Sequence, residues 1–230
     1  MFQRHGISQL ADVCDKPSRS KFKSYAIGYV HIDIVEVRTE EGKLHLFVGI
    51  DRTSKLVFAR LEPKATRMIA CQYLRDLIDA FPYRLHTVLT DNGVQFRHPP
   101  RYRDGPTARF AGHLFDRICA EHGVEHRLTK PNRPWSDEDR TTVWGTVFPR
   151  NGQVERMNRM IKDATVKRYD YASHDELRRH LQLFIDAYNH ARRLKTLRGL
   201  TPYEFVMQQW TKEPKRFKTD PSNHTPGPNA

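Results

Sequence analysis

Apolar residues between positions 26 and 62 fall into three short runs that are separated by polar turns. The runs are rich in Val, Ile, Leu, Phe and Tyr, the residues that favour β-strands. Because the turns are only a few residues long, we predict that the strands pair as an antiparallel meander. The predicted strands are at about 26–37, 43–50 and 55–62, with turns at Glu41-Gly42 and at 51–54.

From residue 65 the apolar spacing changes to that of an amphipathic helix, and one apolar stripe runs through 65–80. Strand-like and helical segments then alternate. The further strands are predicted at about 85–90 and 124–128, and the further helices at about 108–122, 152–169, 173–190 and from Thr201-Pro202 onward. Ser173 and Thr201 are suitable N-caps, and proline suits the first helical position.

This order of elements predicts an α/β protein in which helices cover a sheet. In this arrangement the strand that contains Asp33 is central, and the strand that ends at Asp91 lies beside it. The helix that contains Glu155 can pack across the ends of both strands. The predicted fold therefore brings three acidic residues from distant parts of the chain to one place.

The overall charge points to a polyanionic partner. The chain carries 39 Lys and Arg residues against 27 Asp and Glu residues, a formal net charge of +12. Such an excess favours nucleic acid, although a basic protein that is merely soluble has the same balance. Cys14, Cys71 and Cys119 form no Cys-x-x-Cys pair, which argues against a zinc finger and fits a reducing cytoplasm. No apolar run approaches the roughly 20 residues of a membrane span, so we expect no membrane association.

The three acids are the strongest chemical signal. Asp33 interrupts the apolar strand, Asp91 ends a strand and opens a turn, and Glu155 lies in the first turn of a basic helix. Each has an ordinary alternative, because a strand acid can face solvent or a basic partner, Asp-Asn-Gly is common in turns, and helix starts favour acids. Together they would need a cation between them, and oxygen ligands suit Mg²⁺ or Mn²⁺. Two such ions about 4 Å apart promote phosphodiester chemistry.

The helix around Glu155 offers candidate contacts to DNA. Asn158, Arg159 and Lys162 follow Glu155 at positions that share its face of the helix. An acid followed by bases suits a metal-bound phosphodiester whose flanking phosphates need contacts. The opposite stripe, which we predict to pack inward, consists of Val154, Met157, Ile161 and Ala164.

Other polar residues are weaker candidates. The basic run Arg192, Arg193 and Lys195 is either a solvated helix end or a further nucleic-acid contact. His122 and His126 have no set of metal-like partners and are treated as ordinary residues. The residues expected to shape the site are His31, Asn92, Gly93, Asn151 and Gly152. For His31 a place in the packed core is favoured over a role at the site, and Asn151 is a plausible N-cap.

Three of these segments resemble the catalytic motifs of integrase-core (DDE) transposases of bacterial insertion sequences. The resemblance covers about residues 25 to 210, and the ordered set of motifs is specific where any one alone is not. The segments are His31-Ile32-Asp33, the run from Leu89 to Phe96, and the run from Asn151 to Asn158, with further matches at 48–53, Tyr188-Asn189 and 200–204.

The resemblance implies a ribonuclease H-like fold with a mixed five-stranded sheet and two Mg²⁺ ions, for which Mn²⁺ can substitute. It also implies that Asp33 and Asp91 bridge or flank the metals and that Glu155 completes the shell of the second. In that family the site nicks transposon ends and then uses the released 3′-hydroxyl to attack target DNA. The implied partners are DNA and further copies of the chain, in a bacterial cytoplasm at the nucleoid.

The resemblance also divides the chain. We expect a basic N-terminal arm at 1–24, a catalytic core at 25–170, a C-terminal helical extension at 171–210 and a disordered tail at 211–230. The chain departs from the family in two ways. Only a short arm precedes the core, in place of helix-turn-helix modules, and about fifteen extra residues at 136–150 precede the Glu155 helix.

Two alternatives to an active transposase remain, and a third alternative concerns only which acid is the ligand. The chain could be an inactive, truncated DNA-binding remnant. It could be a ribonuclease H-like nuclease that hydrolyses but does not join strands. Glu138, within the insertion, could replace Glu155 as a ligand.

Overall fold

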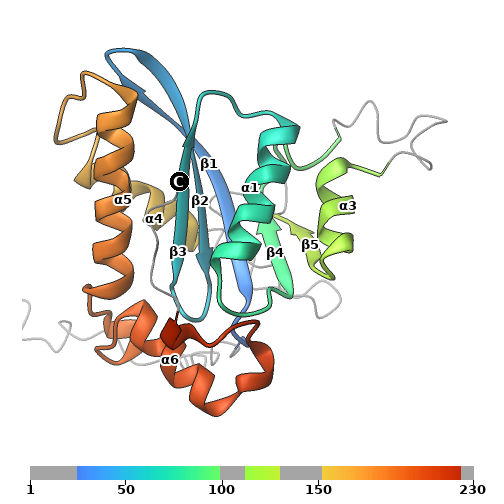
Figure 1. Ribbon diagram of the computed structural model, residues 1–230. Coiled ribbons are helices and arrows are strands. Elements are labelled where there is room, and N and C mark those ends of the chain that lie inside the picture. Colours follow the sequence, from blue (N-terminus) through green and yellow to red (C-terminus); the bar gives the residue numbers. More distant parts are fainter. Residues whose placement is uncertain (1–24, 99–111, 130–151, 224–230) are drawn as a thin grey trace, which may run out of the picture.

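The structure of the protein is a computed structural model, which describes residues 25–98, 112–129 and 152–223. Its centre is a five-stranded mixed sheet in the order β3-β2-β1-β4-β5, as Figure 1 shows. β2 pairs antiparallel with β1 and β3, whereas β4 pairs parallel with β1 and β5. The strands are β1 (Tyr29–Thr39), β2 (Gly42–Asp51), β3 (Val57–Glu62), β4 (Thr87–Thr90) and β5 (Glu125–Leu128). The meander, the central position of the Asp33 strand and the neighbouring Asp91 strand were all predicted correctly.

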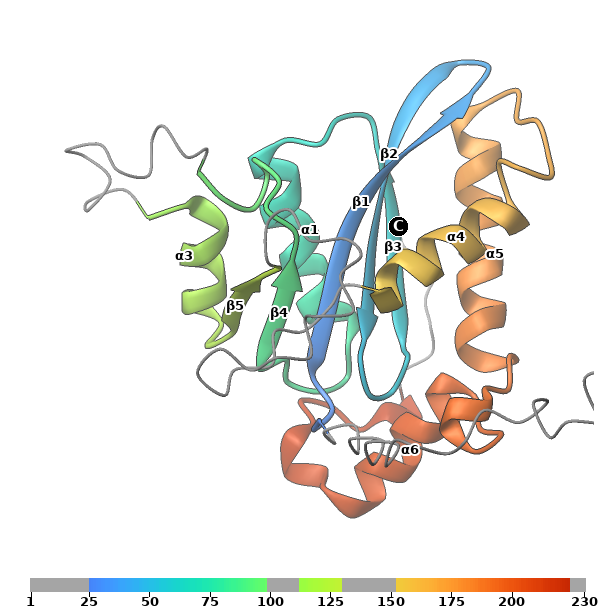
Figure 2. The ribbon, with the colours of Figure 1, turned by 180° about the vertical axis from the view of Figure 1, so that it is seen from behind.

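Helices cover both faces of the sheet. α1 and α3 lie on one face, and α4 and α5 lie on the other, as the views from front and back show (Figures 1 and 2). The helices are α1 (Arg67–Ala80), α3 (Leu114–Glu121), α4 (Gly152–Ala164), α5 (His174–His190) and α6 (Pro202–Lys212). Ser173 and Thr201 are the N-caps of α5 and α6, and Thr201 forms a full capping box with Glu204.

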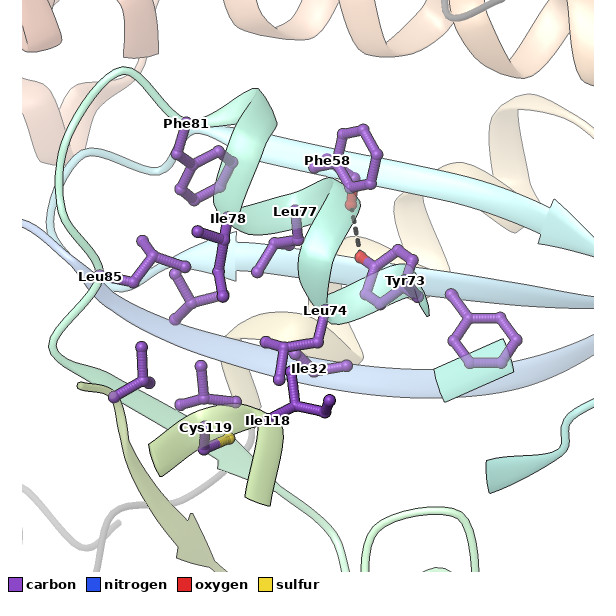
Figure 3. Close-up of a cluster of buried hydrophobic side chains, with 14 of the residues drawn as sticks. Ile32, Phe58, Tyr73, Leu74, Leu77, Ile78, Phe81, Leu85, Ile118 and Cys119 are labelled. Carbon is purple, nitrogen blue, oxygen red and sulfur yellow. Dashed lines mark hydrogen bonds between the residues drawn. The ribbon is translucent and has the colours of Figure 1, made fainter. Parts of the chain in front are cut away.

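The α1 face of the sheet holds the larger core cluster. Ile32 on β1, Leu74 and Leu77 on α1 and Ile118 on α3 meet there (Figure 3). The Tyr73 hydroxyl donates to the carbonyl of Phe58 on β3 at 3.0 Å, so this buried polar group is satisfied. Because strand side chains alternate between faces, the residue after Ile32 points away from this cluster, toward α4.

The α4 face holds the second cluster. Val154, Met157 and Ile161 on α4 pack with the inward residues of β2, as the apolar stripe predicted. α5 covers the free edge of the sheet: the Asn189 side chain accepts from the Val57 amide at 3.0 Å and donates to the Val57 carbonyl at 2.8 Å. This pair of bonds satisfies the start of an edge strand that would otherwise have open backbone groups.

Two predictions about helix and tail lengths were wrong. α4 ends at Ala164, five residues earlier than predicted, and the chain continues as a turn. Residues 211–223 do not fit a disordered tail, because α6 extends to Lys212 and short 3₁₀ turns follow at Pro214–Arg216 and Pro221–Asn223.

The reason for the second error is aromatic packing. Phe217 is buried, stacks edge-on with Tyr83 and Trp210, and pairs with Tyr83 in an isolated β-bridge. The prolines that suggested disorder instead shape a return path onto the core. The predicted arm at 1–24, the insertion at 136–150, Glu138 and Asn151 lie outside the described residues. Within the described ranges, no helix combines the length and apolarity that crossing a membrane requires.

Candidate active site

Asp33 lies at the middle of β1 on the face covered by α4. Its Oδ1 accepts from the Ile34 amide at 2.9 Å, and its Oδ2 accepts from the Asn158 side-chain amide on α4 at 2.7 Å. Burial, assisted by the negative charges of Asp91 and Glu155, raises the pKa of Asp33 from 3.8 to about 6, even though both hydrogen bonds oppose the shift. Asp91 and Glu155 are therefore close enough for their charges to act on Asp33.

Asp91 follows β4 directly and stands beside Asp33 because the two strands are parallel and in register. His31 pairs with Leu89, the last pair of the β1–β4 ladder, and Asp33 and Asp91 each follow that pair by two residues. Side chains opposite each other in parallel strands project to the same face, at the strand spacing of about 4.8 Å. The Asp91 residue is exposed, whereas Asp33 is half-buried.

The loop after Asp91 is fastened to the end of β5. The Gly93 amide donates to Asp91 Oδ1 at 3.0 Å, and the Asn92 side chain donates to the Thr129 carbonyl at 2.7 Å. A Cβ on Gly93 would lie 3.0 Å from Asp91 Oδ1 and 2.6 Å from the end of the Gln95 side chain, so a larger residue here would displace Gln95 and crowd the Asp91 carboxylate. Asn92 and Gly93 thus occupy the positions expected of residues that shape the site.

Glu155 lies in the first turn of α4 and is exposed. α4 is anchored on the sheet by its apolar stripe, and Figure 2 shows it lying across the back of the sheet, between the central strands and α5. Gly152, which begins α4, has open space where a Cβ would stand. The helix therefore presents Glu155 beside the aspartates, at a distance over which its charge acts on Asp33.

Asn158 was predicted to contact DNA, and this prediction was wrong. Its side chain is only 4% exposed and is directed into the protein at Asp33. A position three residues after Glu155 lies at the border between the exposed and the buried stripe of the helix, and the Asp33 carboxylate draws the amide inward. Its Oδ1 is buried and has no hydrogen-bond partner among the described residues.

The donor chemistry of the site fits a hard divalent cation. Asp33 and the two acids whose charges act on it supply carboxylate oxygens, and the Asn158 Oδ1 offers an acceptor for a water bound to such an ion. The described part of the chain nevertheless contains no group of three His, Cys, Asp or Glu side chains arranged closely enough to hold a metal ion. The acids are thus gathered by the fold without converging on one point.

The remaining candidates lie around this site in different settings. His31 is 1% exposed and packs with its ring 5.4 Å from that of Tyr29, which places it in the core. Arg159 is exposed on α4 and Lys162 is half-buried there. These two bases keep the setting expected of phosphate contacts.

The basic run after α5 is partly engaged in the protein. The Arg193 guanidinium donates to the Gly199 carbonyl at 3.0 Å and lies 3.6 Å from Glu204. Arg192 contacts the Met160 sulfur at 2.9 Å, and Lys195 is exposed. Arg193 therefore shapes the turn between α5 and α6, whereas Arg192 and Lys195 remain at the surface.

Sequence reasoning missed one set of residues near the site. Thr90 and His126 are hydrogen-bonded behind Asp91, although His126 was treated as ordinary. The position of His126 is the feature that could have indicated its role, because His126 lies on β5, which pairs with β4, and is opposite Val88 in that ladder. Recognising it required the pairing of β4 with β5, which the sequence alone does not specify.

Two known sequence families and several solved structures are similar to this chain. Two sequence families, both described as "Integrase core domain", match residues 24–134 and 149–202. Residues 135–148 between the matches overlap the predicted insertion. No curated protein gives a significant sequence match.

Several solved structures share the fold. The catalytic core domain of BIV integrase has a TM-score of 0.53 at 21% identity, covering 80% of this chain and 97% of that one. The HTLV-2 integrase catalytic core domain in complex with magnesium has a TM-score of 0.54 at 17% identity, covering 77% and 94%. A chain of the simian T-cell lymphotropic virus intasome has a TM-score of 0.52 at 23% identity, covering 72% of this chain and 49% of that one. At these identities the structures establish the ribonuclease H-like fold.

Proposed function

The chain belongs to the integrase core domain family, and we propose that it cuts and joins DNA by metal-dependent phosphodiester chemistry. The observation that carries the proposal is the pKa of Asp33, which burial and the charges of Asp91 and Glu155 raise to about 6. A partly buried carboxylate on which two further negative charges act is costly to a protein unless a cation offsets it. The net charge of +12 supports a polyanionic substrate.

In this proposal Asp33, Asp91 and Glu155 hold Mg²⁺, or Mn²⁺ in its place. When bound, the metal supplies Lewis-acid activation of the attacking oxygen and charge stabilisation of the leaving oxygen. Asn158 orients the Asp33 carboxylate through the bond to Oδ2. The Gly93 amide orients Asp91 in the same way, so two of the three acids are fixed before any ligand binds.

DNA would approach over the exposed end of α4. Arg159 and Lys162 follow Glu155 along this helix and supply charge for phosphates that flank the reacting one. Arg192 and Lys195 extend the basic surface beyond α5. The proposed substrates are the ends of a bacterial mobile element and target DNA at the nucleoid. Dimeric and trimeric forms of the HTLV-2 core support a homo-oligomer.

The proposal is tested by nicking and joining of labelled duplex DNA with Mg²⁺ or Mn²⁺. The wild type is compared with Asp33→Asn, Asp91→Asn and Glu155→Gln, and with Glu121→Gln as a matched control on an exposed acid of α3. Activity that is lost in the three site variants and kept in the control is expected. Full joining by Asp33→Asn together with Asp91→Asn would refute the proposal. A variant that lacks 136–150 shows whether the insertion blocks the site.

A second candidate is a DNA-binding fragment without chemistry. The absence, among described residues, of three converging ligand side chains favours it. Calorimetry separates the two candidates, because the active site requires that Mn²⁺ binding heat disappears in Asp33→Asn. Equal heats in wild type and variant, together with silent joining assays, favour the fragment.

A further inference from the structure

A chain of hydrogen bonds runs behind Asp91 from the surface to the backbone. The Asp116 carboxylate on α3 lies 2.5 Å from His126 Nδ1, and the other ring nitrogen, Nε2, lies 2.9 Å from the Thr90 hydroxyl. The Thr90 hydroxyl in turn donates to the Asp91 carbonyl at 3.0 Å. We call Asp116, His126 and Thr90 the support chain, because its last bond ends on the residue that carries a candidate ligand.

Donor counting links the protons of the support chain to one another. The Thr90 hydroxyl has one proton, which it can give either to the Asp91 carbonyl, which only accepts, or to His126 Nε2. Where the hydroxyl donates to the Asp91 carbonyl, it accepts from His126, so Nε2 carries a proton. An ionised Asp116 carboxylate also only accepts, so its bond to Nδ1 uses a proton on that nitrogen.

The surroundings of His126 support a carboxylate at Asp116. Partial burial acts to raise the pKa of Asp116, but the hydrogen bond and charge of His126, together with the charges of His113 and His98, hold it below its ordinary value of 3.8. The His126 side chain is only 6% exposed, while that of Asp116 is 53% exposed. The His126 imidazole is thus buried, and the Asp116 carboxylate lies at the solvent-exposed end of the support chain.

Other groups around the ring are accounted for. From α3 the Phe115 ring packs on the imidazole at 4.9 Å, and from β4 only the uncharged Thr90 reaches it. The charged neighbours on its own strand, Glu125 and Arg127, project to the other face and pair with each other at 2.7 Å. Among residues 25–98, 112–129 and 152–223, Asp116, with His98 and His113 beyond it, is therefore the charged group that His126 faces.

We propose that His126 is a positioning residue that, through Thr90, holds the backbone of Asp91 in place for catalysis. The inference rests on the proposed function, in which Asp91 is a metal ligand. The Gly93 amide donates a hydrogen bond to the Asp91 carboxylate, and the Thr90 hydroxyl of the support chain donates one to the Asp91 carbonyl. A residue fastened at both its side chain and its backbone keeps one orientation, as ligand sites require.

The support chain also makes the position of Asp91 sensitive to one proton. If His126 loses the proton on Nε2, that nitrogen becomes an acceptor, and the Thr90 hydroxyl turns to donate to it. The Asp91 carbonyl then loses the hydrogen bond that the Thr90 hydroxyl donated to it. We expect the order of the Asp91 loop, and the activity that depends on it, to fall together as His126 becomes neutral.

The first test reads the structure and needs no activity. In metal-free, isotope-labelled full-length protein, NMR follows the ring nitrogens of His126 and the carbonyl carbon of Asp91 as pH changes. The Asp91 carbonyl is expected to shift with the same midpoint as His126, and to lose that response in Thr90→Val. A carbonyl that ignores the His126 transition, or that responds equally in Thr90→Val, overturns the proposal.

The second test reads catalysis as a function of pH. A glutamine at 126 keeps an amide donor but cannot titrate, so His126→Gln is expected to remove the alkaline fall of kcat while leaving KM for DNA unchanged. Thr90→Val is expected to lower kcat by about 10-fold or more at all pH values, as loss of a ligand's support does. The matched control is His122→Gln, which removes an exposed imidazole at the end of the same α3 helix.

The outcomes separate this inference from the proposed function. Silence of the wild type and of the variant that lacks 136–150 refutes the function, and the NMR coupling alone then decides whether His126 holds the Asp91 backbone through Thr90. An active wild type whose alkaline limb persists unchanged in His126→Gln refutes the inference and leaves the function standing.

Discussion

Replacing Asp33 by asparagine should make the metal-free protein more stable while it abolishes activity. The charged form of this carboxylate is disfavoured in the folded protein, because burial and the charges of Asp91 and Glu155 raise its pKa from 3.8 to about 6. Between these two values the folded state binds more protons than the unfolded state. Stability therefore falls as pH rises through this window, and the full penalty remains above it.

The size of the effect follows from the pKa shift. About two pKa units at 1.36 kcal/mol each correspond to a penalty of roughly 3 kcal/mol above pH 6. For a chain of this length, 1 kcal/mol changes Tm by about 2–4 °C. We therefore expect Asp33→Asn to raise Tm by roughly 6–12 °C at pH 7.5 in the presence of a chelator, and to have little effect at pH 3.5, where Asp33 is already protonated.

The site can accept asparagine without losing its hydrogen bonds. The Oδ1 of the new residue keeps the Ile34 amide, and its amide group faces Asn158. Asn158 has a buried Oδ1 without a partner among the described residues, so a flip of its amide supplies the acceptor that the variant needs. The gain from removing the charge is therefore not offset by an orphaned donor.

The assay is thermal and urea unfolding of wild type, Asp33→Asn and the exposed-acid control Glu121→Gln at both pH values. The control should stay within about 0.5 kcal/mol of wild type. Added Mg²⁺ should stabilise the wild type and not Asp33→Asn, because the ion binds the ionised carboxylate. A variant that is less stable than wild type at pH 7.5, or that gains equally at both pH values, would show that Asp33 is not held under electrostatic strain.

Three further predictions concern the frame around the site. Asn158→Ala should weaken Mn²⁺ binding about 10-fold or more in calorimetry, because it removes the donor that orients Asp33; binding equal to wild type would contradict this role. Asp51→Ala should lower the free energy of unfolding in urea by about 3 kcal/mol or more, since the buried Asp51 side chain accepts from three backbone amides; a loss below about 1 kcal/mol would mean that water replaces it. Phe217→Ala should cost about 3–5 kcal/mol in the same measurement, and an unchanged unfolding midpoint would show that the C-terminal segment is not docked.

The sheet and the place of the acids were predictable because they rest on local patterns. Alternating apolar residues defined the strands, and a strand meander followed by a crossover helix leaves few positions for β4. Asp33 and Asp91 could be paired from sequence, since parallel neighbours carry their opposite residues on one face. Glu155 followed from the amphipathic stripe of its helix.

The contacts that complete the site were not predictable, for a physical reason. Whether Asn158 points outward or inward depends on an acceptor on another element, which a helical wheel does not contain. His126 gained its role only through β4–β5 pairing and the approach of α3. The tail was predicted to be disordered because it is rich in proline. Its order depends on the packing of Phe217 against Tyr83, a contact that composition does not indicate.

The way α4 is docked separates its position from the length of chain that leads into it. Its apolar stripe and the Asn158–Asp33 bond fix the helix on the sheet by non-covalent contacts alone. Chain connectivity before α4 is therefore free to vary, since the entropy of closing a loop grows slowly with its length. The connection can therefore be lengthened or shortened while Glu155 keeps its place on the sheet, which makes the segment before α4 a position at which insertions are tolerated.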